Sequence, residues 1–172
     1  QPKGVAVPHR QVVRYLDGVR ERLDIVDGAT YGLTQSLSFD FAVTMFYLAL
    51  ATGGSVHLIP RRATAQEVAT HLAVARIDYL KLTPSHLAAL AAEVPARDLL
   101  PRRALLLGGE ASRADWTREL AGLSPAAVIN HYGPTEATVG VTTYEVRPGV
   151  DPGSVTTPIG RPLPHARVYV LD

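Results

Sequence analysis

Residues 78–94, DYLKLTPSHLAALAAEV, connect a strand-like stretch to a helix-like stretch and indicate the fold class of the chain. DYLKL at 78–82 is typical of a strand, and SHLAALAAEV at 85–94 is typical of a helix. Pro84 stands between them, and proline is favoured in the first turn of a helix because its missing N–H would have no partner there. The segment therefore predicts a strand that leads directly into a helix.

The same succession of strand and helix continues along most of the chain. Helices are expected after Pro8, with an apolar face of Val12, Val13, Leu16, Val19 and Leu23, and at 40–52, 65–75 and 112–120. Strands are expected at 30–35, 55–59, 103–109 and 126–132. This pattern predicts an α/β fold with a mostly parallel sheet and helices on both faces. The Pro- and Gly-rich residues 147–165 are predicted to form a loop before a final strand at 167–172.

Composition excludes several classes of protein. With 47% hydrophobic residues, 19% charged residues and a net charge of +1, the chain is neither disordered nor a nucleic-acid-binding protein. It contains no cysteine, which excludes disulfides and thiolate chemistry and is consistent with a cytoplasmic protein. The longest apolar stretch begins at Phe41 and is too short to span a membrane.

Polar residues follow four of the predicted strands. SLSFD follows 30–35, KLTPS ends 78–82, GGEA follows 103–107 and HYGPTE follows 126–130. In open parallel sheets, ligands bind at the carboxyl ends of the strands. The sequence therefore predicts that these four segments converge on one ligand site.

The segment YGPTE, residues 132–136, carries groups suited to a nucleotide. Glycine and proline allow a tight turn that a ligand can approach closely. Tyr132 offers a ring for stacking, Thr135 a hydroxyl for a phosphate oxygen, and Glu136 a carboxylate for Mg²⁺. The alternative is a turn with a capping threonine and a solvated glutamate.

Four segments resemble motifs of the adenylate-forming enzymes and occur in the order found in that family. They are PKGVAVPHR (2–10), SFDFAVTMFYLALATGGSVHLIP (38–60), LLLGGEA (105–111) and NHYGPTEATV (130–139). They are most similar to the amino-acid-activating adenylation domains of nonribosomal peptide synthetases. The resemblance implies that residues 1–172 are one flavodoxin-like, substrate-recognising subdomain of a larger adenylation domain, expected in antibiotic biosynthesis.

The family's reaction sets the expected cofactors and partners. An amino-acid carboxylate attacks the α-phosphorus of ATP with Mg²⁺, and the aminoacyl group then passes to the phosphopantetheine thiol of a peptidyl carrier protein. The family's phosphate loop would precede Gln1, and its ribose-binding motif and lysine-bearing domain would follow Asp172. We therefore expect these residues to act with the rest of the adenylation domain, and to be inactive alone.

The resemblance also assigns roles to residues of the nucleotide site. Thr135 and Glu136 would be the catalytic residues, with Thr135 at the α-phosphate and Glu136 on the metal. Asn130 would meet the exocyclic amine of adenine. The ATP-binding set is Gly109, Glu110, Ala111, Asn130, Tyr132, Gly133 and Thr135.

A second set matches the family's substrate-binding positions: Asp40, Phe41, Thr44, Lys81, Leu106, Gly108, His131, Val139 and Gly140. Asp40 would bind the α-ammonium, and a lysine facing a pocket requires an opposite charge. Lys81 and His131 therefore predict L-aspartate, with asparagine or a β-substituted aspartate next, since Phe41 departs from the expected smaller aliphatic residue. The alternatives are an N-cap role for Asp40 and a Lys81 that extends to solvent.

Other functional classes remain open at this point. An acyl-coenzyme A ligase is the nearest alternative within the family, and Asp40 in its apolar surroundings argues against it. A non-catalytic α/β binding module is a second alternative, since a fold alone does not establish a function. A dinucleotide-binding domain is disfavoured because no GxGxxG follows the first strand.

Overall fold

The computed structural model describes residues 3–171 and contains a seven-stranded mixed sheet with the order β2-β1-β3-β4-β5-β6-β7. The strands are β1 (Thr30–Leu33), β2 (Ser55–Leu58), β3 (Tyr79–Leu82), β4 (Ala104–Gly108), β5 (Ala127–Tyr132), β6 (Thr142–Val146) and β7 (Arg161–Pro162). The first five are parallel, and β6 and β7 are antiparallel. This strand order is the flavodoxin-like one, and it confirms the predicted fold class.

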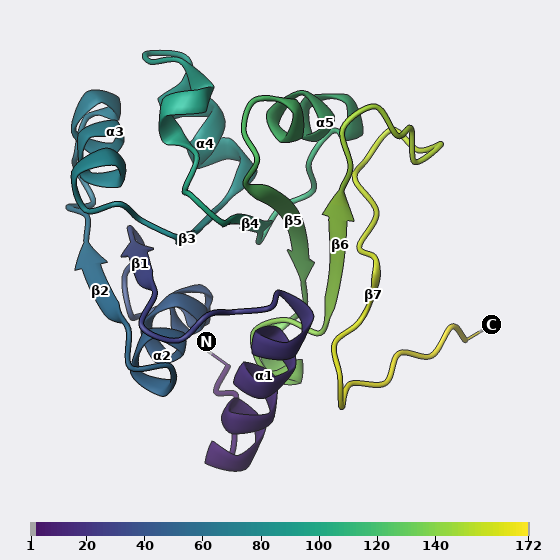
Figure 1. Cartoon of the computed structure of the whole chain (residues 1–172). Coiled ribbons are helices and arrows are strands. Elements are labelled where there is room, and N and C mark those ends of the chain that lie inside the picture. The colour runs from purple at the N-terminus through teal and green to yellow at the C-terminus, as the bar shows by residue number, and fades with distance from the viewer. Residues whose placement is uncertain (1–2, 172) are drawn as a thin grey trace.

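Helices cover both faces of the sheet (Figure 1). One face carries α1 (His9–Arg22) and α2 (Val43–Ala51), and the other carries α3 (Ala65–Val74), α4 (Pro84–Ala91) and α5 (Ala114–Gly122). Three short 3₁₀ helices, η1 (Asp40–Ala42), η2 (Ala96–Leu99) and η3 (Thr135–Ala137), lie in connections. Connections between parallel strands are right-handed, and the strand order runs one way from β1 to β2 and the other way from β2 to β5, so the connecting helices fall on opposite faces.

Local sequence explains where α3 and α4 begin and end. Thr64 and Glu67 form a capping box at the start of α3. Thr83 caps α4 by accepting a hydrogen bond from the His86 backbone N–H, and Pro84 occupies the first turn. α4 ends at Ala91, three residues earlier than predicted, because the residue before Pro95 is disfavoured in helical conformation.

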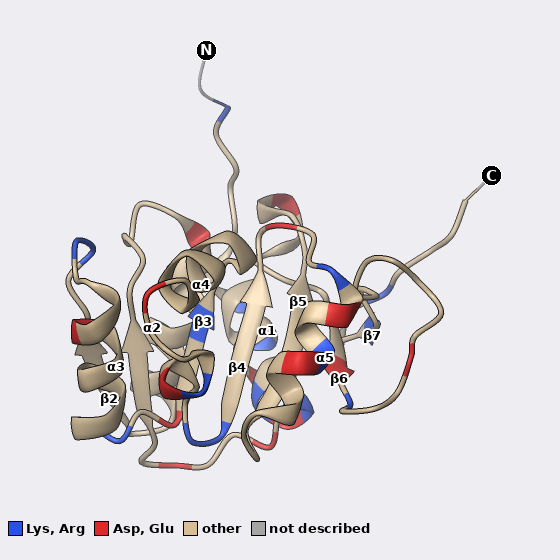
Figure 2. Cartoon of the chain, turned by 90° about the horizontal axis from the view of Figure 1, so that it is seen from above, with Lys and Arg blue, Asp and Glu red and all other residues tan. Residues whose placement is uncertain are grey.

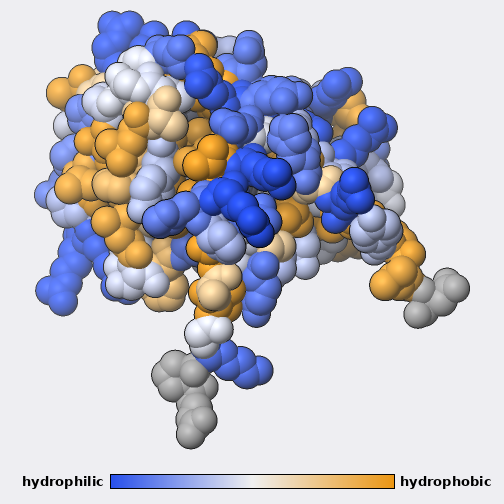
Figure 3. Space-filling model, turned by 90° about the horizontal axis from the view of Figure 1, so that it is seen from below, coloured by the Kyte–Doolittle hydropathy of each residue, from blue (hydrophilic) through white to orange (hydrophobic). Residues whose placement is uncertain are grey.

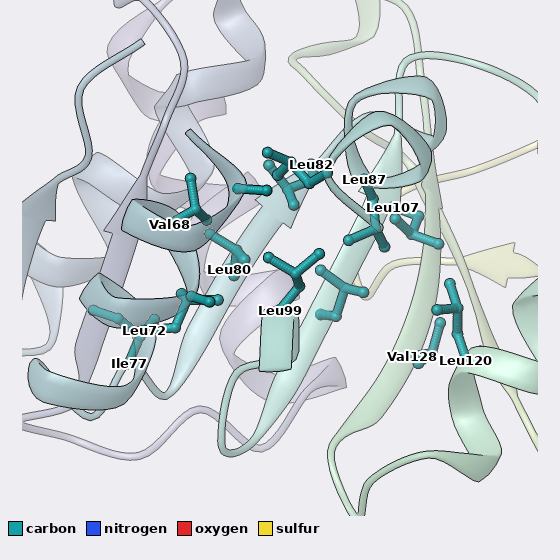
Figure 4. Close-up of a cluster of buried hydrophobic side chains, with 14 of the residues drawn as sticks. Val68, Leu72, Ile77, Leu80, Leu82, Leu87, Leu99, Leu107, Leu120 and Val128 are labelled. Carbon is teal, nitrogen blue, oxygen red and sulfur yellow. The ribbon is translucent and has the colours of Figure 1, made fainter. Parts of the chain in front are cut away.

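The core beneath α3, α4 and α5 is formed mainly by apolar side chains, with Thr117 of α5 and Asn130 of β5 as buried polar members, and we call it the apolar face. Figure 4 shows leucine, isoleucine and valine side chains from β3, β4, β5 and the helices meeting in one cluster. Leu80 and Leu82 reach it from β3, and Leu105 and Leu107 reach it from β4. Removing such side chains from water is the main stabilising contribution to the fold.

The core beneath α1 and α2 contains polar groups, and we call it the polar face. Its apolar members include Tyr31, Met45 and Leu106, but Thr44, Lys81 and His131 are also buried. Figure 2 shows β3 coloured for a basic residue in the middle of the sheet. A charged residue at a central strand position needs a specific explanation.

The outer surface on the α1/α2 side is partly apolar. Figure 3 shows apolar side chains gathered over the region of α2 and β2, where Tyr47, Leu50 and Leu58 are exposed. Among the described residues, no helix combines the length and the apolar character that crossing a membrane would need.

The C-terminal part differs from the prediction in two places. Residues 147–165 are not loop throughout, because β7 pairs with β6 and Arg113 bridges to Thr156. Residues 167–171 do not form the predicted strand. Their alternating apolar side chains are exposed and have no partner strand within the described residues, and a strand needs such a partner to form its ladder of hydrogen bonds.

Candidate active site

Strand register places four of the predicted substrate residues on one face of the sheet. Lys81 lies beside Leu106, and Gly108 lies beside His131. Because side chains alternate along a strand, Lys81, Leu106 and His131 share the polar face, whereas their neighbours Leu82, Leu105 and Val128 belong to the apolar face. The parallel register therefore gathers residues that are far apart in the sequence.

Lys81 is sealed inside the protein. Its side chain is 1% exposed, so it does not extend to solvent. Its Nζ donates to Thr44 Oγ1 at 2.9 Å and lies 4.1 Å from the centre of the Phe41 ring. Among the described residues no carboxylate forms an ion pair with it. Burial lowers the pKa of Lys81 to about 7, and the charge of Asp40 opposes this shift.

His131 is equally buried and has no hydrogen-bond partner on either ring nitrogen among the described residues. Burial, followed by the charge of Lys81, holds the pKa of His131 well below its usual range. The ring is therefore neutral near pH 7 and can donate one N–H. A buried polar group without a partner is costly, and both ring nitrogens are available to bond a ligand that enters this site.

Tyr15 of α1 joins this group, although no sequence motif pointed to it. Its hydroxyl lies 2.6 Å from Thr44 Oγ1, and its ring stacks on His131 with centroids 5.9 Å apart. Burial raises the pKa of Tyr15 well above its ordinary value, so the hydroxyl stays protonated. The only available signal was that a buried tyrosine hydroxyl usually finds a partner.

Asp40 and Phe41 begin the segment that leads into α2. Asp40 is the first residue of η1, and no side chain caps either η1 or α2. The alternative N-cap role for Asp40 is therefore wrong. The Phe41 ring lies over Lys81 and against Gly108 and Gly109, so it occupies space beside the ammonium.

Val139 and Gly140 close the site around His131. Val139 has a φ of +66° and is the central residue of a γ-turn, in which the Gly140 N–H donates to the Thr138 carbonyl at 2.8 Å. A Cβ at position 140 would collide with the His131 ring, so only glycine fits there. Positive φ at a β-branched residue costs energy and tends to occur at functional sites.

A separate cavity of about 290 Å³ lies at the carboxyl end of β5. Six of the seven residues predicted to bind ATP line it: Gly109, Glu110, Ala111, Asn130, Tyr132 and Gly133. Thr135 is not among its lining residues. The other lining residues are His131, Thr156, Thr157 and Ile159. The last three come from the segment predicted only as loop, where the sequence carried no motif.

The orientation of Asn130 is fixed by that same segment. Its Nδ2 donates to the carbonyls of Pro158 at 2.8 Å and Thr157 at 3.3 Å. Its Oδ1 is the atom left to accept a hydrogen bond, which suits an exocyclic amine. Glu110 instead accepts from the backbone N–H and hydroxyl of Ser85, at 3.1 and 2.8 Å, and so connects the end of β4 to α4.

Thr135 and Glu136 lie on η3, directly after β5, and both are exposed. No group of three or more histidine, cysteine or acidic side chains among residues 3–171 could hold a metal by itself. Mg²⁺ often uses only one or two carboxylates and completes its shell with phosphate and water. Glu136 is a single exposed carboxylate on the segment that follows β5, and one such carboxylate can serve as a protein ligand of that kind.

The sequence matches the AMP-binding enzyme family over residues 1–172. The chain belongs to this family. It is a segment of an adenylation domain of the nonribosomal peptide synthetase type. It is 33% identical to a subunit of plipastatin synthase from Bacillus subtilis, and this match covers 100% of the segment and 7% of the relative. It is 34% identical to malpinin synthetase from Mortierella alpina, covering 2% of that protein. The segment is thus a small part of the length of these relatives.

Solved structures agree with the fold of the adenylation segment. The nonribosomal peptide synthetase FmoA3 superposes with a TM-score of 0.83 at 27% identity, over 94% of the segment and 18% of that chain. The adenylation domain AlmE from Vibrio cholerae, in complex with glycyl-adenosine-5'-phosphate, superposes with a TM-score of 0.79 at 23% identity, over 94% of the segment and 31% of that chain.

Proposed function

We propose that this segment recognises L-aspartate and contributes to the ATP site for aspartate adenylation in nonribosomal peptide synthesis. The observation that carries the proposal is the pair of buried polar side chains, Lys81 and His131, which lie on one face of the sheet and form no ion pair within residues 3–171. Burying a cation in the core is costly unless a bound ligand carries an opposite charge.

Lys81 supports a carboxylate over a carboxamide. An ammonium group has three N–H donors, and Thr44 accepts from one of them. A substrate carboxylate would accept from the others and neutralise the charge, whereas a carboxamide supplies only a neutral dipole. The Phe41 ring, which lies over the ammonium, must turn aside to admit the carboxylate, and side-chain rotamer changes of this kind are common on binding.

His131 offers a neutral donor that fits a carboxylate oxygen, so the preference for a carboxylate over a carboxamide rests on Lys81. Its lowered pKa removes the need to invoke an imidazolium charge, and one N–H of the neutral ring is sufficient to bind a carboxylate oxygen. Asparagine would be better served by a side chain that accepts from its amide. Together the two side chains would bind the carboxylate from two sides.

Asp40 would bind the α-ammonium of the amino acid, and its freedom from a capping role supports this assignment. The α-carboxylate then attacks the α-phosphorus, a new O–P bond forms, and pyrophosphate leaves. The chain contributes by holding the reactants in position. The Asn130 Oδ1 would accept from adenine, and Tyr132 and Gly109–Ala111 would frame the base. The AMPPNP-bound form of FmoA3, with a TM-score of 0.83 and 27% identity, supports a nucleotide at this fold.

Thr135 and Glu136 would act at the phosphates. Thr135 would donate its hydroxyl to an α-phosphate oxygen, and Glu136 would hold Mg²⁺, which neutralises phosphate charge when bound. The phosphopantetheine thiol of a peptidyl carrier protein would subsequently displace AMP from the aminoacyl adenylate.

An ATP–pyrophosphate exchange screen tests the substrate. The complete adenylation domain that contains this chain is assayed with the proteinogenic amino acids and with β-substituted aspartates. We expect aspartate to give the highest kcat/KM, and His131→Glu to shift the preference toward asparagine because glutamate accepts from an amide N–H. If aspartate is not among the best substrates, the assignment is wrong.

A second experiment tests the nucleotide side. Glu136→Gln in the complete domain is expected to lower kcat strongly and raise the Mg²⁺ concentration needed for half-maximal rate, because an amide is a poorer ligand for Mg²⁺. Circular dichroism checks that the fold is unchanged. An unaltered rate and metal dependence would return Glu136 to the role of a solvated turn residue.

A further inference from the structure

Tyr15 contacts His131 directly and is connected to Lys81 through Thr44, so it touches both sides of the predicted carboxylate site. It belongs to α1, far in sequence from Lys81 and His131, and lies outside the set of predicted substrate residues. It is 6% exposed. Its hydroxyl bonds Thr44, which accepts from Lys81, and its ring lies against His131.

Because Thr44 can bond both Tyr15 and Lys81, the Tyr15 hydroxyl can influence the position of the Lys81 ammonium. A threonine hydroxyl has one proton and can accept two hydrogen bonds. The ammonium form of Lys81, which is the form that would bind a carboxylate, can only donate, so Thr44 must present a lone pair to it. Tyr15, at 2.6 Å, engages the hydroxyl from the other side. With both contacts made, the Thr44 rotamer is fixed, and the ammonium of Lys81 is held at one place on the polar face.

The ring of Tyr15 positions His131, the second donor of the predicted carboxylate site. It stacks on His131 with an interplanar angle of 18°. Gly140 packs against the imidazole as well. The imidazole is thus held by packing, because no hydrogen bond to its nitrogens holds it within the described residues. Precise placement of both donors is what separates a carboxylate from its isosteric amide.

We propose that Tyr15 is a positioning residue that determines specificity, by holding Lys81 through Thr44 and His131 through ring stacking so that both point their donors at a substrate carboxylate. This inference rests on the proposed function. It assigns to α1 a role in substrate choice, in addition to its role in packing.

The chain offers a matched control for the hydroxyl. Tyr31 is also buried, its hydroxyl lies 3.0 Å from Thr52 Oγ1, and its ring stacks on Tyr79 with centroids 5.2 Å apart. It lies in the same core cluster as Tyr15 but contacts neither Lys81 nor His131 through these interactions. Tyr31→Phe therefore removes the same type of bond from a comparable environment.

The experiment measures kcat/KM for aspartate and asparagine in the complete adenylation domain by pyrophosphate exchange. We expect Tyr15→Phe to lower the aspartate-to-asparagine ratio about fivefold to tenfold, the effect of losing one hydrogen bond in the site. Tyr31→Phe should lower Tm to a similar extent and leave the ratio unchanged. Thr44→Val should lower the ratio as well, and Tyr15→Phe added to Thr44→Val should lower it no further.

The outcomes separate this inference from the proposed function. If the unmodified domain does not favour aspartate, the proposed function fails. If it favours aspartate and Tyr15→Phe leaves the ratio unmoved, or Tyr31→Phe moves it equally, only the role of Tyr15 is overturned. Should Tyr15→Phe not fold, Thr44→Val interrupts the same connection from the other side, and an unchanged ratio in that variant also refutes the inference.

Discussion

The two faces of the sheet bury different kinds of side chains. The apolar face, under α3, α4 and α5, packs leucine, isoleucine, valine and alanine into one cluster. The polar face, under α1 and α2, buries Thr44, Lys81 and His131 among apolar neighbours. Both faces use the same strands, so adjacent residues of β3 serve opposite purposes: Leu82 packs in the apolar core, and Lys81 is a buried amine without an ion-pair partner among the described residues.

This contrast indicates how stability and recognition can be separated in one small sheet. The apolar face contributes mostly apolar burial, and its buried polar side chains, Thr117 and Asn130, are hydrogen-bonded. The polar face retains groups whose burial is costly, which suggests selection for ligand binding more than for stability. Substitutions on the two faces should therefore change different measured quantities.

The largest effect is expected from Lys81→Met on the polar face. Loss of the cation should reduce kcat/KM for aspartate about 100-fold to 1,000-fold, the scale of breaking a desolvated charge pair. The free energy of unfolding should not fall, because methionine fills similar space without a charge. Leu82→Met, one residue away on the apolar face, is the control and should leave kinetics unchanged. Equal activity losses in both variants would contradict the division between the faces.

Leu105→Ala, on the apolar face, is expected to lower stability without changing substrate preference, the reverse of Lys81→Met. Leu105 is fully buried in the apolar cluster, and truncation should lower the free energy of unfolding by about 2–5 kcal/mol through lost burial and a cavity. Denaturant titration of the complete domain measures this loss. The aspartate-to-asparagine ratio of the folded fraction should stay constant, and a changed ratio would show that the apolar face also takes part in recognition.

A pH series of KM for aspartate tests whether Lys81 must be protonated to bind the substrate. With the pKa of Lys81 lowered to about 7 in the free site, the ammonium form is lost as pH rises above 7. KM for aspartate should then rise by up to about tenfold per pH unit, until the pH reaches the pKa of the bound lysine.

The same group links pH to stability with a definite sign. The unfolded lysine, with a pKa of 10.5, holds its proton between pH 7 and 10.5, whereas the folded one has lost it. The unfolded state therefore binds more protons in that window, and this residue makes the free energy of unfolding rise with pH. Both pH dependences should disappear in Lys81→Met, and a persistent slope would mean that another group is responsible.

The smallest effect is expected at the start of α3. Thr64→Ala removes the capping box formed with Glu67 and should lower the free energy of unfolding by about 1 kcal/mol. Thermal unfolding measures the change, and pyrophosphate exchange should be unaffected. A loss of exchange activity would show that α3 is coupled to the site across the sheet.

The sequence was sufficient to predict the five parallel strands β1–β5 and the helices α1–α5, because each strand–helix unit carries its own local signals, but it did not predict the antiparallel strands β6 and β7. Pro84 and Thr83 mark the start of α4. The positions of GGEA and HYGPTE after their strands predicted which edge of the sheet carries the ligand site. Residues 167–171 show the limit of such signals. Their alternation matches a strand, but only a neighbouring strand can satisfy the backbone, and alternation does not reveal whether a neighbour is present.

Candidate site residues were predictable where a motif or a strand end marked them. Lys81 stood out because it interrupts an apolar strand. Tyr15 did not stand out, because its position on the helix matches ordinary core packing and its role depends on the distance to Thr44. Thr156, Thr157 and Ile159 were missed for the same reason, since they reach the cavity through the path of a long segment and not through a local pattern.

β5 determines which ligand each residue faces. Asn130 and His131 are consecutive, yet the first bonds the segment at 157–158 and the second stacks on Tyr15. In the proposed assignment, the nucleotide and the amino acid would be bound by consecutive residues of one strand, about 3.3 Å apart along the backbone. A single residue inserted before Asn130 would exchange the two orientations. Directed changes of substrate should therefore be sought by substitution at fixed length, because any change of length in β5 would disrupt both recognitions at once.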